Sequence, residues 1–251
     1  MNANAYNLNQ GQKEAADAFF EFLFDREAKG FIISGPAGVG KTYWMGYIID
    51  IIMPRYLETC KLIGVDPDYD SVTMTATTNK AAEVLEFATG RTTQTIHSFL
   101  NLTLYEDYES GKTKLNKNPR TWTVHEQKII FIDECSMIDS QLFNIIGEGT
   151  HQCKIVYVGD RNQLAPVTEK LSPVYLQGYQ MFELTEQMRT SIPELQVTNQ
   201  QLRDTVETGI FNPIHEVPGI IEYLDDVNMQ KMLDITFANQ TKESRVLTYT
   251  N

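Results

Sequence analysis

Residues 35–42 read Gly-Pro-Ala-Gly-Val-Gly-Lys-Thr and match the pattern G-x-x-x-x-G-K-[S/T]. The glycines permit backbone conformations in which several N–H groups converge on one phosphate group. The Lys41 ammonium would pair with the β- and γ-phosphates, and the Thr42 hydroxyl would ligate Mg²⁺. A glycine-rich structural turn is the alternative interpretation. The nucleotide-binding residues predicted here are Gly35, Pro36, Ala37, Gly38, Val39, Gly40, Lys41, Thr42 and Tyr43.

Two further polar groups complete a site for phosphate chemistry. Asp133 and Glu134 follow the apolar run Ile129–Ile132. Asp133 would hold Mg²⁺ directly or through water, and Glu134 would polarise the attacking water as general base. Two acids at a strand end can also be merely solvated, but a preceding phosphate loop favours the catalytic interpretation. Gln163, in the segment Gly-Asp-Arg-Asn-Gln that starts at residue 159, would reach the γ-phosphate or the water.

Short β-rich runs alternate with helical patterns along the chain. The predicted strands are Phe31–Ser34, Val72–Thr75, Lys128–Ile132 and Lys154–Val158. The predicted helices are Asn9–Leu23, Thr42–Met53, Asn79–Ala88 and Ser140–Gly147. This alternation predicts an α/β fold, a parallel sheet with helices on both faces and ligands at the carboxyl ends of its strands.

Three segments depart from the alternation. Asn101–Gln127 is long and polar, and Ser110-Gly111 marks a turn between two short strand patterns, Leu102–Tyr108 and Lys112–Leu115, so it predicts a small inserted hairpin. Thr185–Val227 is expected to be mostly helical, and Ser244–Thr250 to be another buried strand. The expected domains are a motor domain over 1–100 and 126–243, a hairpin subdomain over 101–125, and the start of a second domain over 244–251.

Composition limits the class of protein. The net charge of −12 counts against a duplex-binding surface, but Gly111–Trp122 carries four basic residues and no acid. Three cysteines without a C-x-x-C spacing predict no disulfide framework and no zinc site, which favours a reducing cytoplasm. No run approaches the roughly 18 apolar residues of a membrane span, and residues 1–15 lack an apolar signal core. A cytoplasmic protein without membrane contact is therefore expected.

Taken in order, these segments resemble superfamily 1B helicases, the branch with RecD-like and phage Dda-type enzymes, whose motor is a RecA-like P-loop fold. Leu8–Gln12 resembles the entry motif, whose glutamine, here Gln12, contacts adenine. Motif I is the phosphate loop, motif II is Asp-Glu-Cys-Ser-Met from residue 133, and motif III is Gly-Asp-Arg-Asn-Gln-Leu-Ala-Pro-Val from residue 159. Leu184–Arg189 resembles motif IV, whose arginine, here Arg189, reaches the γ-phosphate. The resemblance thus adds Arg189 to the catalytic residues Lys41, Glu134 and Gln163.

The resemblance also implies a single-stranded DNA site. Ala76–Ala82 is similar to motif Ia and Thr95–Phe99 to the following Thr-Ile-His-Ser segment, both of which contact DNA in the family. A pin that splits the duplex would lie in the predicted hairpin, with Tyr105 or Tyr108 stacking on the last base pair and two lysines on phosphates. The DNA-binding residues implied are Thr77, Thr78, Asn79, Lys80, His97, Ser98, Tyr105, Tyr108, Lys112 and Lys114.

The function implied is an ATP- and Mg²⁺-dependent DNA helicase, moving 5′ to 3′ by resemblance, usually monomeric, acting on single-stranded and fork DNA, with replication or recombination proteins as candidate partners. Family members carry a second RecA-like domain, so the 251-residue chain is expected to be an N-terminal fragment. The alternative is a nucleotide-gated DNA-binding or regulatory ATPase that does not translocate. A small-molecule kinase fits poorly, because it leaves residues 159–163 and 184–189 unexplained.

Overall fold

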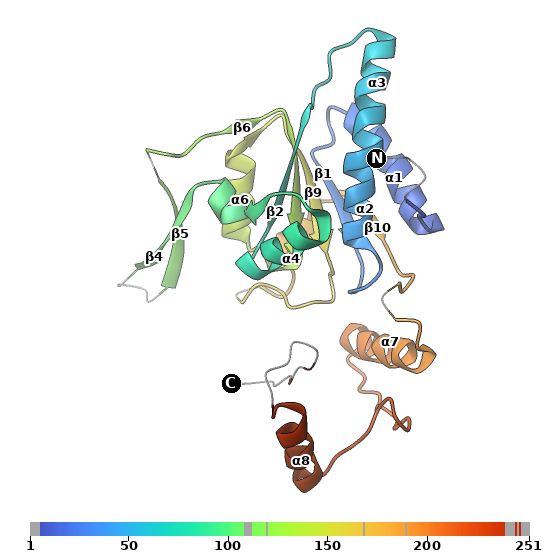
Figure 1. The fold of residues 1–251 in the computed structure, drawn as a ribbon. Coiled ribbons are helices and arrows are strands. Elements are labelled where there is room, and N and C mark those ends of the chain that lie inside the picture. The colour runs from blue at the N-terminus through green and yellow to red at the C-terminus, as the bar shows by residue number, and fades with distance from the viewer. Residues whose placement is uncertain are drawn as a thin grey trace. The chain divides into compact units, whose positions relative to one another are not determined.

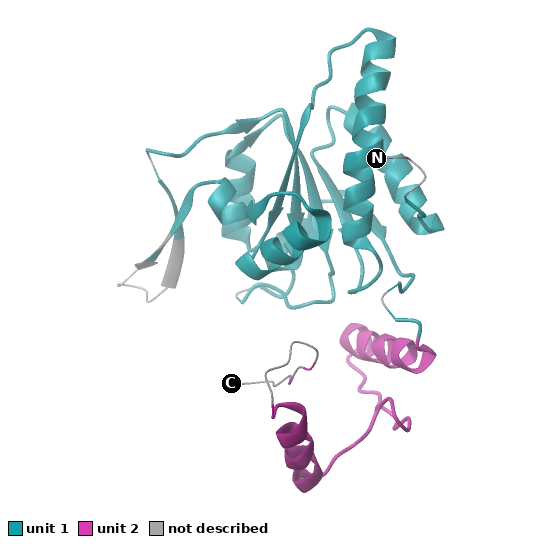
Figure 2. Ribbon diagram, in the orientation of Figure 1, with its two compact units in different colours: residues 1–191 teal, residues 192–251 magenta. Residues whose placement is uncertain are grey.

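The computed structural model describes residues 6–107, 112–118, 120–167, 169–188, 190–238, 244 and 246. The chain forms two compact units, Met1–Ser191 and Ile192–Asn251 (Figure 2). Among the described residues, the first unit holds the sheet and the strands, and the second holds the helices α7 and α8. In the part of the chain that is described, no helix combines the length and apolar character needed to cross a bilayer. The domain boundaries predicted from the sequence stay predictions.

A six-stranded sheet forms the centre of the first unit (Figure 1). All neighbouring strands pair in parallel. Their order is β10 (Gln180–Glu183), β1 (Gly30–Ser34), β9 (Lys154–Gly159), β7 (Lys128–Asp133), β2 (Ser71–Ala76) and β3 (Thr93–Thr95). The predicted parallel α/β fold is confirmed, and so are the four predicted strands, each within a residue of its expected bounds.

Side chains alternate between the two faces of the sheet, as the strand geometry requires. Phe31 and Ile33 of β1 join one apolar cluster, and Ile32 joins the other. The first cluster lies under α1 (Gln10–Phe24), α2 (Lys41–Tyr47), α3 (Met53–Ile63) and α4 (Asn79–Thr89). The second lies under α5 (Ile96–Phe99), the short helices η3 (Cys135–Met137) and η4 (Pro173–Leu176), and α6 (Ser140–Glu148). Burial of large apolar side chains on both faces, about 1.5–3 kcal/mol each, fixes the strand ends in space.

The helix after the phosphate loop is longer than predicted. Its expected end was Met53, but α2 continues through a π-helical turn, η2 (Ile48–Ile52), into α3, which ends at Gly64. Pro54 cannot donate the usual helical hydrogen bond and crowds the preceding turn. The wider turn accommodates it, because the Met53 N–H bonds to the carbonyl of Ile48 five residues back.

The predicted hairpin is present as two antiparallel strands, β4 (Leu102–Asp107) and β5 (Lys112–Lys117). Its base is fixed to the sheet domain. The side chain of Gln141 donates to the carbonyl of Leu115 at 3.3 Å, and Trp122 packs against the second apolar cluster. The predicted turn at Ser110-Gly111 lies outside the described residues. A two-residue parallel pair, β6 (His125–Glu126) with β8 (Thr150–His151), follows the hairpin.

The second unit contains α7 (Pro193–Thr208) and α8 (Asp226–Thr236). The expectation of mostly helix over Thr185–Val227 is wrong for the described residues between 185 and 192 and for residues 209–225, which are irregular apart from a bridge between Val217 and Ile221. Gly209 ends α7 in the left-handed conformation, and prolines 213 and 218 cannot donate helical hydrogen bonds. Of the predicted strand Ser244–Thr250, only residues 244 and 246 are described, so it stays untested.

Candidate nucleotide-binding site

The loops that follow the parallel strands meet at one edge of the sheet. Ser34, the last residue of β1, pairs with both Gly159 of β9 and Glu183 of β10. The loop after β1 is tied to its neighbours, because the Gly35 N–H donates to the Gly159 carbonyl at 3.1 Å and the Leu184 N–H to the Ser34 carbonyl at 2.8 Å. Motifs far apart in the sequence are therefore side by side at this edge.

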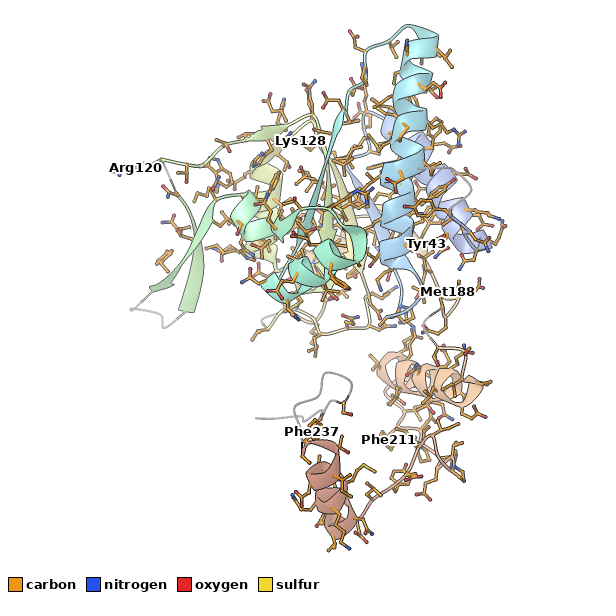
Figure 3. All side chains as sticks on the ribbon, viewed as in Figure 1. Tyr43, Arg120, Lys128, Met188, Phe211 and Phe237 are labelled. Atoms are coloured by element: carbon orange, nitrogen blue, oxygen red, sulfur yellow. The ribbon has the colours of Figure 1, made fainter. Side chains whose placement is uncertain are left out.

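The phosphate loop needs its glycines for two separate reasons. Gly35, Gly38 and Gly40 have φ values of +155°, +90° and +80°, which side chains disfavour. A Cβ on Gly35 would also lie 2.3 Å from the carbonyl oxygen of Leu184. The segment after β10 braces the loop from outside, since the Met188 N–H donates to the Gly38 carbonyl at 2.8 Å. Tyr43 and Met188 lie at this same end of the unit (Figure 3).

The side chain of Gln12 is hydrogen-bonded to the main chain of the phosphate loop. Its side chain is 1% exposed, and its Nε2 donates to the carbonyl of Val39 at 3.1 Å. Its Oε1 accepts from the N–H of Asn9 at 3.1 Å, which completes the capping box at the start of α1. Both ends of the amide are thus engaged within the protein, and contact of Gln12 with adenine stays a prediction.

The ammonium of Lys41 folds back onto its own loop. Its Nζ donates to the carbonyls of Gly35 at 2.6 Å and Pro36 at 2.9 Å. Burial lowers the pKa of Lys41, while the nearby carboxylates of Asp133 and Asp160 partly oppose that effect. An ammonium held by neutral carbonyls in a poorly hydrated loop gains a full counter-charge when a phosphate anion arrives.

Asp133 ends β7 close to Lys41. Burial, reinforced by the neighbouring charge of Glu134, raises the pKa of Asp133 to about 6. The N–H of Glu134 donates to its Oδ1 at 2.9 Å. A carboxylate and the hydroxyl of Thr42 are the hard oxygen donors that Mg²⁺ accepts, and Mg²⁺ usually takes its remaining ligands from water and phosphate. The described residues contain no cluster of three or more acidic, histidine or cysteine side chains that could hold a metal ion.

Glu134 is held in a strained backbone conformation, with φ of +55°. Thr77, just after β2, fixes the two acidic residues through both of its own polar groups. Its N–H donates to the carbonyl of Asp133 at 3.1 Å, and its Oγ1 donates to the carbonyl of Glu134 at 3.1 Å. The first residue of the predicted DNA-binding loop is therefore bonded directly to the main chain of the predicted general base.

The turn after β9 presents Gln163 beside these groups. The N–H groups of Asn162 and Gln163 donate to Asp160, at 3.0 Å to its Oδ1 and 3.1 Å to its carbonyl. This turn leaves the side chain of Gln163 exposed. The predicted finger, Arg189, lies outside the described residues, so its position stays untested.

Two of the predicted DNA-binding segments lie together at the same edge. Ala76 at the end of β2 pairs with Thr95 at the end of β3, so the loops that follow are neighbours. Thr78 caps α4 by accepting from the Ala81 N–H at 3.2 Å, and the ammonium of Lys80 lies 3.1 Å from Glu83 on the exposed surface. Asn79 opens α4 and is exposed.

In the second segment, His97 is partly buried, and burial lowers its pKa, so a neutral imidazole is favoured at pH 7. Ser98 is exposed, and its N–H donates to Thr95 at 3.1 Å. In the hairpin, Tyr105 is exposed and lies opposite Lys114. Tyr108 lies outside the described residues, and only the backbone of Lys112 and Lys114 is described.

One candidate site, a cavity next to the phosphate loop, was not predicted from any sequence motif. A cavity of about 410 Å³ opens beside Thr42 and Tyr43, and Tyr6 and Arg91 also line it. Tyr43 accepts from the Asn7 N–H at 2.6 Å, and the Tyr6 ring lies 5.1 Å from that of Tyr43. Only the aromatic spacing near the N-terminus could have signalled this cavity, and such spacing is common in cores.

A strand, a glycine loop on a helix N-terminus, and an acidic end on a nearby strand of the sheet define a P-loop nucleotide-binding fold. A family model described as an AAA domain matches residues 7–214, and the chain belongs to that family. With its motifs in order, it is a member of the superfamily 1B helicases.

Two relatives match over most of the chain. The ATP-dependent DNA helicase dda of Enterobacteria phage T4 is 26% identical over 98% of this chain and 54% of its own length. Protein R530 of Acanthamoeba polyphaga mimivirus is 28% identical over 82% of this chain and 44% of its own length. The chain therefore spans about half the length of the curated relatives it matches.

Among solved structures, the Pif1 helicase from Candida albicans has a TM-score of 0.50 and 18% identity, with 98% of this chain and 59% of that chain covered. At this identity the likeness concerns the fold.

Proposed function

We propose that this chain is the first motor domain of an ATP-dependent DNA helicase. The observation that carries the proposal is the meeting of Lys41, Asp133 and Glu134 at one edge of the sheet, beside a glycine loop whose N–H groups can receive a triphosphate. The phage T4 relative is an ATP-dependent DNA helicase, and this likeness supports the same activity for the present chain. Directed movement 5′ to 3′ rests on the resemblance alone.

Each residue would have a separate role in hydrolysis. Lys41 would exchange its bonds to Gly35 and Pro36 for the β- and γ-phosphates, and Thr42 and Asp133 would hold Mg²⁺, which would supply positive charge to the phosphates. Glu134 takes a proton from the attacking water, and Gln163 orients that water. Arg189 stabilises charge on the transferred phosphoryl group from the segment that also braces the phosphate loop.

Single-stranded DNA would lie across the loops after β2 and β3. The N-terminus of α4, with Thr78, Asn79 and Lys80, offers N–H groups and a cation to a phosphate, and Ser98 is exposed nearby. Thr77 joins this surface to Glu134, so movement of the DNA loop can reach the catalytic carboxylate. This link supports DNA-stimulated hydrolysis.

The decisive experiment compares ATP hydrolysis with and without single-stranded DNA. We expect stimulation by DNA in the wild type, no turnover in Lys41→Ala, and a fall in kcat far larger than the change in ATP affinity in Arg189→Ala. Turnover that is indifferent to DNA, or full activity in Lys41→Ala, would contradict the proposal.

The hairpin strands β4 and β5 are proposed as the pin. Replacing Tyr105 and Tyr108 together with alanine should reduce unwinding by the whole helicase while DNA-stimulated hydrolysis is retained. Equal loss of both activities, or loss of neither, would count against a pin.

A further inference from the structure

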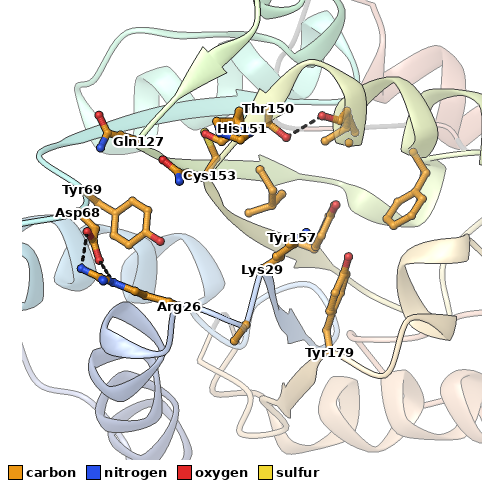
Figure 4. A pocket seen from close by; sticks show the side chains of 16 residues that line it. Arg26, Lys29, Asp68, Tyr69, Gln127, Thr150, His151, Cys153, Tyr157 and Tyr179 are labelled. Carbon is orange, nitrogen blue, oxygen red and sulfur yellow. Dashed lines mark hydrogen bonds and ion pairs between the residues drawn. The ribbon is translucent and has the colours of Figure 1, made fainter.

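A second cavity, of about 620 Å³, lies at the opposite edge of the sheet from the phosphate loop. Its lining includes Lys29, Tyr69, Cys153 and Tyr179, which directly or closely precede β1, β2, β9 and β10. Figure 4 shows Tyr69 entering the space from one side and the rings of Tyr157 and Tyr179 standing parallel on another. The volume is typical of small-molecule sites.

Two buried tyrosines of this cavity keep their hydroxyl groups unpaired. Tyr69 is 5% and Tyr157 is 2% exposed, and within the described part of the chain neither hydroxyl has a hydrogen-bond partner. By contrast, Tyr56 accepts from the N–H of Asp68 at 3.0 Å, and the Tyr175 hydroxyl lies 3.5 Å from the Cys135 sulfur. Buried tyrosine hydroxyls usually find a partner. Tyr69 and Tyr157 are exceptions, and both line the same cavity. Every fully buried polar side-chain atom among the described residues has a hydrogen-bond partner. The two unpaired hydroxyl groups are therefore not fully buried, and we infer that they open onto the cavity.

The charges around the cavity favour an anion, although the chain carries −12 overall. Asp68 is the single carboxylate among the lining residues, and Arg26 neutralises it through two hydrogen bonds of 2.9 and 3.1 Å. Lys29 lines the same space with a side chain that is paired to no described residue. Behind the wall, the Lys154 ammonium is buried and donates to the main-chain carbonyls of Asp25 and Ala28 rather than to a carboxylate.

Part of the remaining wall is apolar or aromatic, and Gln127, Thr150, His151 and Gln152 add polar side chains to the rest. Phe143, Ile146 and Ile155 line the apolar part, and the rings of Tyr157 and Tyr179 stack at 5.9 Å with an interplanar angle of 9°. We propose that this cavity binds a small organic carboxylate with a flat apolar body, whose acceptor oxygens meet the hydroxyls of Tyr69 and Tyr157 and whose charge is matched by Lys29. Burial raises the pKa of both tyrosines, so both hydroxyls stay protonated donors at neutral pH.

The test uses 3-(4-hydroxyphenyl)propionate as the probe and the corresponding neutral amide as its matched control. The probe is titrated into the full 251-residue chain, and binding is followed by calorimetry and by the backbone amide signals of Gly147, Gln152 and Cys153. We expect the acid to bind roughly ten-fold more tightly than the amide, since charge-assisted hydrogen bonds are about twice as strong as neutral ones. Signals of the phosphate loop should not move.

Variants locate the contacts. Tyr69→Phe and Tyr157→Phe each remove one hydroxyl oxygen and keep the ring. Each variant should bind the acid with roughly five- to ten-fold lower affinity and should still fold. Lys29→Gln should reduce the preference for the acid over the amide. Tyr47→Phe, on α2 and outside the lining of this cavity, should change nothing. Equal binding of acid and amide, shifted signals elsewhere, or wild-type affinity in both phenylalanine variants would overturn the proposal.

Discussion

Asp133→Asn should stabilise the nucleotide-free protein while removing its activity. The pKa of Asp133 is raised from 3.8 to about 6, so the folded chain resists ionising this side chain more than the unfolded chain does. This difference of about two units between the folded and unfolded pKa values corresponds to a loss of roughly 3 kcal/mol in the free energy of unfolding. The stability of the wild type therefore falls as pH rises through 3.8 to 6, and the full cost is present above pH 6.

The difference in the free energy of unfolding between the wild type and Asp133→Asn should depend on pH. A change in packing alone would give the same difference at every pH. At pH 8 the wild type carries the whole cost of roughly 3 kcal/mol, and at pH 5 about half of it, because the folded carboxyl is then mostly protonated. Asparagine keeps an oxygen for the N–H of Glu134 but removes a charge from near Lys41, so the net gain at pH 8 is expected to be roughly 2 kcal/mol.

Urea unfolding of wild type and variant at pH 8 and pH 5, without nucleotide or Mg²⁺, measures both quantities. Asp66→Asn, at an exposed position, serves as the matched control and should have no effect at either pH. A variant that is destabilised at pH 8, or a difference that is the same at both pH values, would refute the reasoning about Asp133.

Three other outcomes are expected. Burial lowers the pKa of Lys154 to about 8, so the folded chain loses this buried charge at a lower pH than the unfolded chain does. The free energy of unfolding of the wild type should therefore rise by roughly 2 kcal/mol relative to that of Lys154→Met between pH 7 and pH 9.5, as measured by urea unfolding. A difference between the two proteins that stays constant with pH would contradict this. Thr77→Val removes one hydrogen bond to Glu134 and should lower DNA-stimulated kcat by roughly 2- to 10-fold, with rescue by Thr77→Ser. Gly35→Ala should abolish nucleotide binding measured by calorimetry, because its Cβ would meet main-chain atoms, whereas Gly147→Ala, in open space, should bind normally.

The sequence was sufficient for the parts of the site that are local. Residues 31–42 combine an apolar strand, glycines and a helix start within one short segment, and the structure keeps that order. The acidic pair after β7 was recognisable for the same reason. Each of these features depends on the preferences of neighbouring residues and hardly on the rest of the chain.

The features that could not be predicted from the sequence depend mainly on which strands are neighbours in the sheet. β10, with the sequence Gln-Met-Phe-Glu, is a short edge strand that has no apolar run, and β3 is three residues long. The bond from Thr77 to Glu134 exists because β2 lies beside β7, which periodicity cannot predict. The long helix was cut short in the prediction because the π-helical turn before Pro54 has no recognised signal.

The most direct test of the whole account is a crystal structure of the chain with Mg²⁺ and a nonhydrolysable ATP analogue. We expect the β-phosphate to lie against the N–H groups of residues 35–42, with the Lys41 ammonium moved from the Gly35 and Pro36 carbonyls onto the phosphates. A nucleotide found elsewhere on the chain, or bound with Lys41 still on those carbonyls and Asp133 away from the metal, would contradict the account.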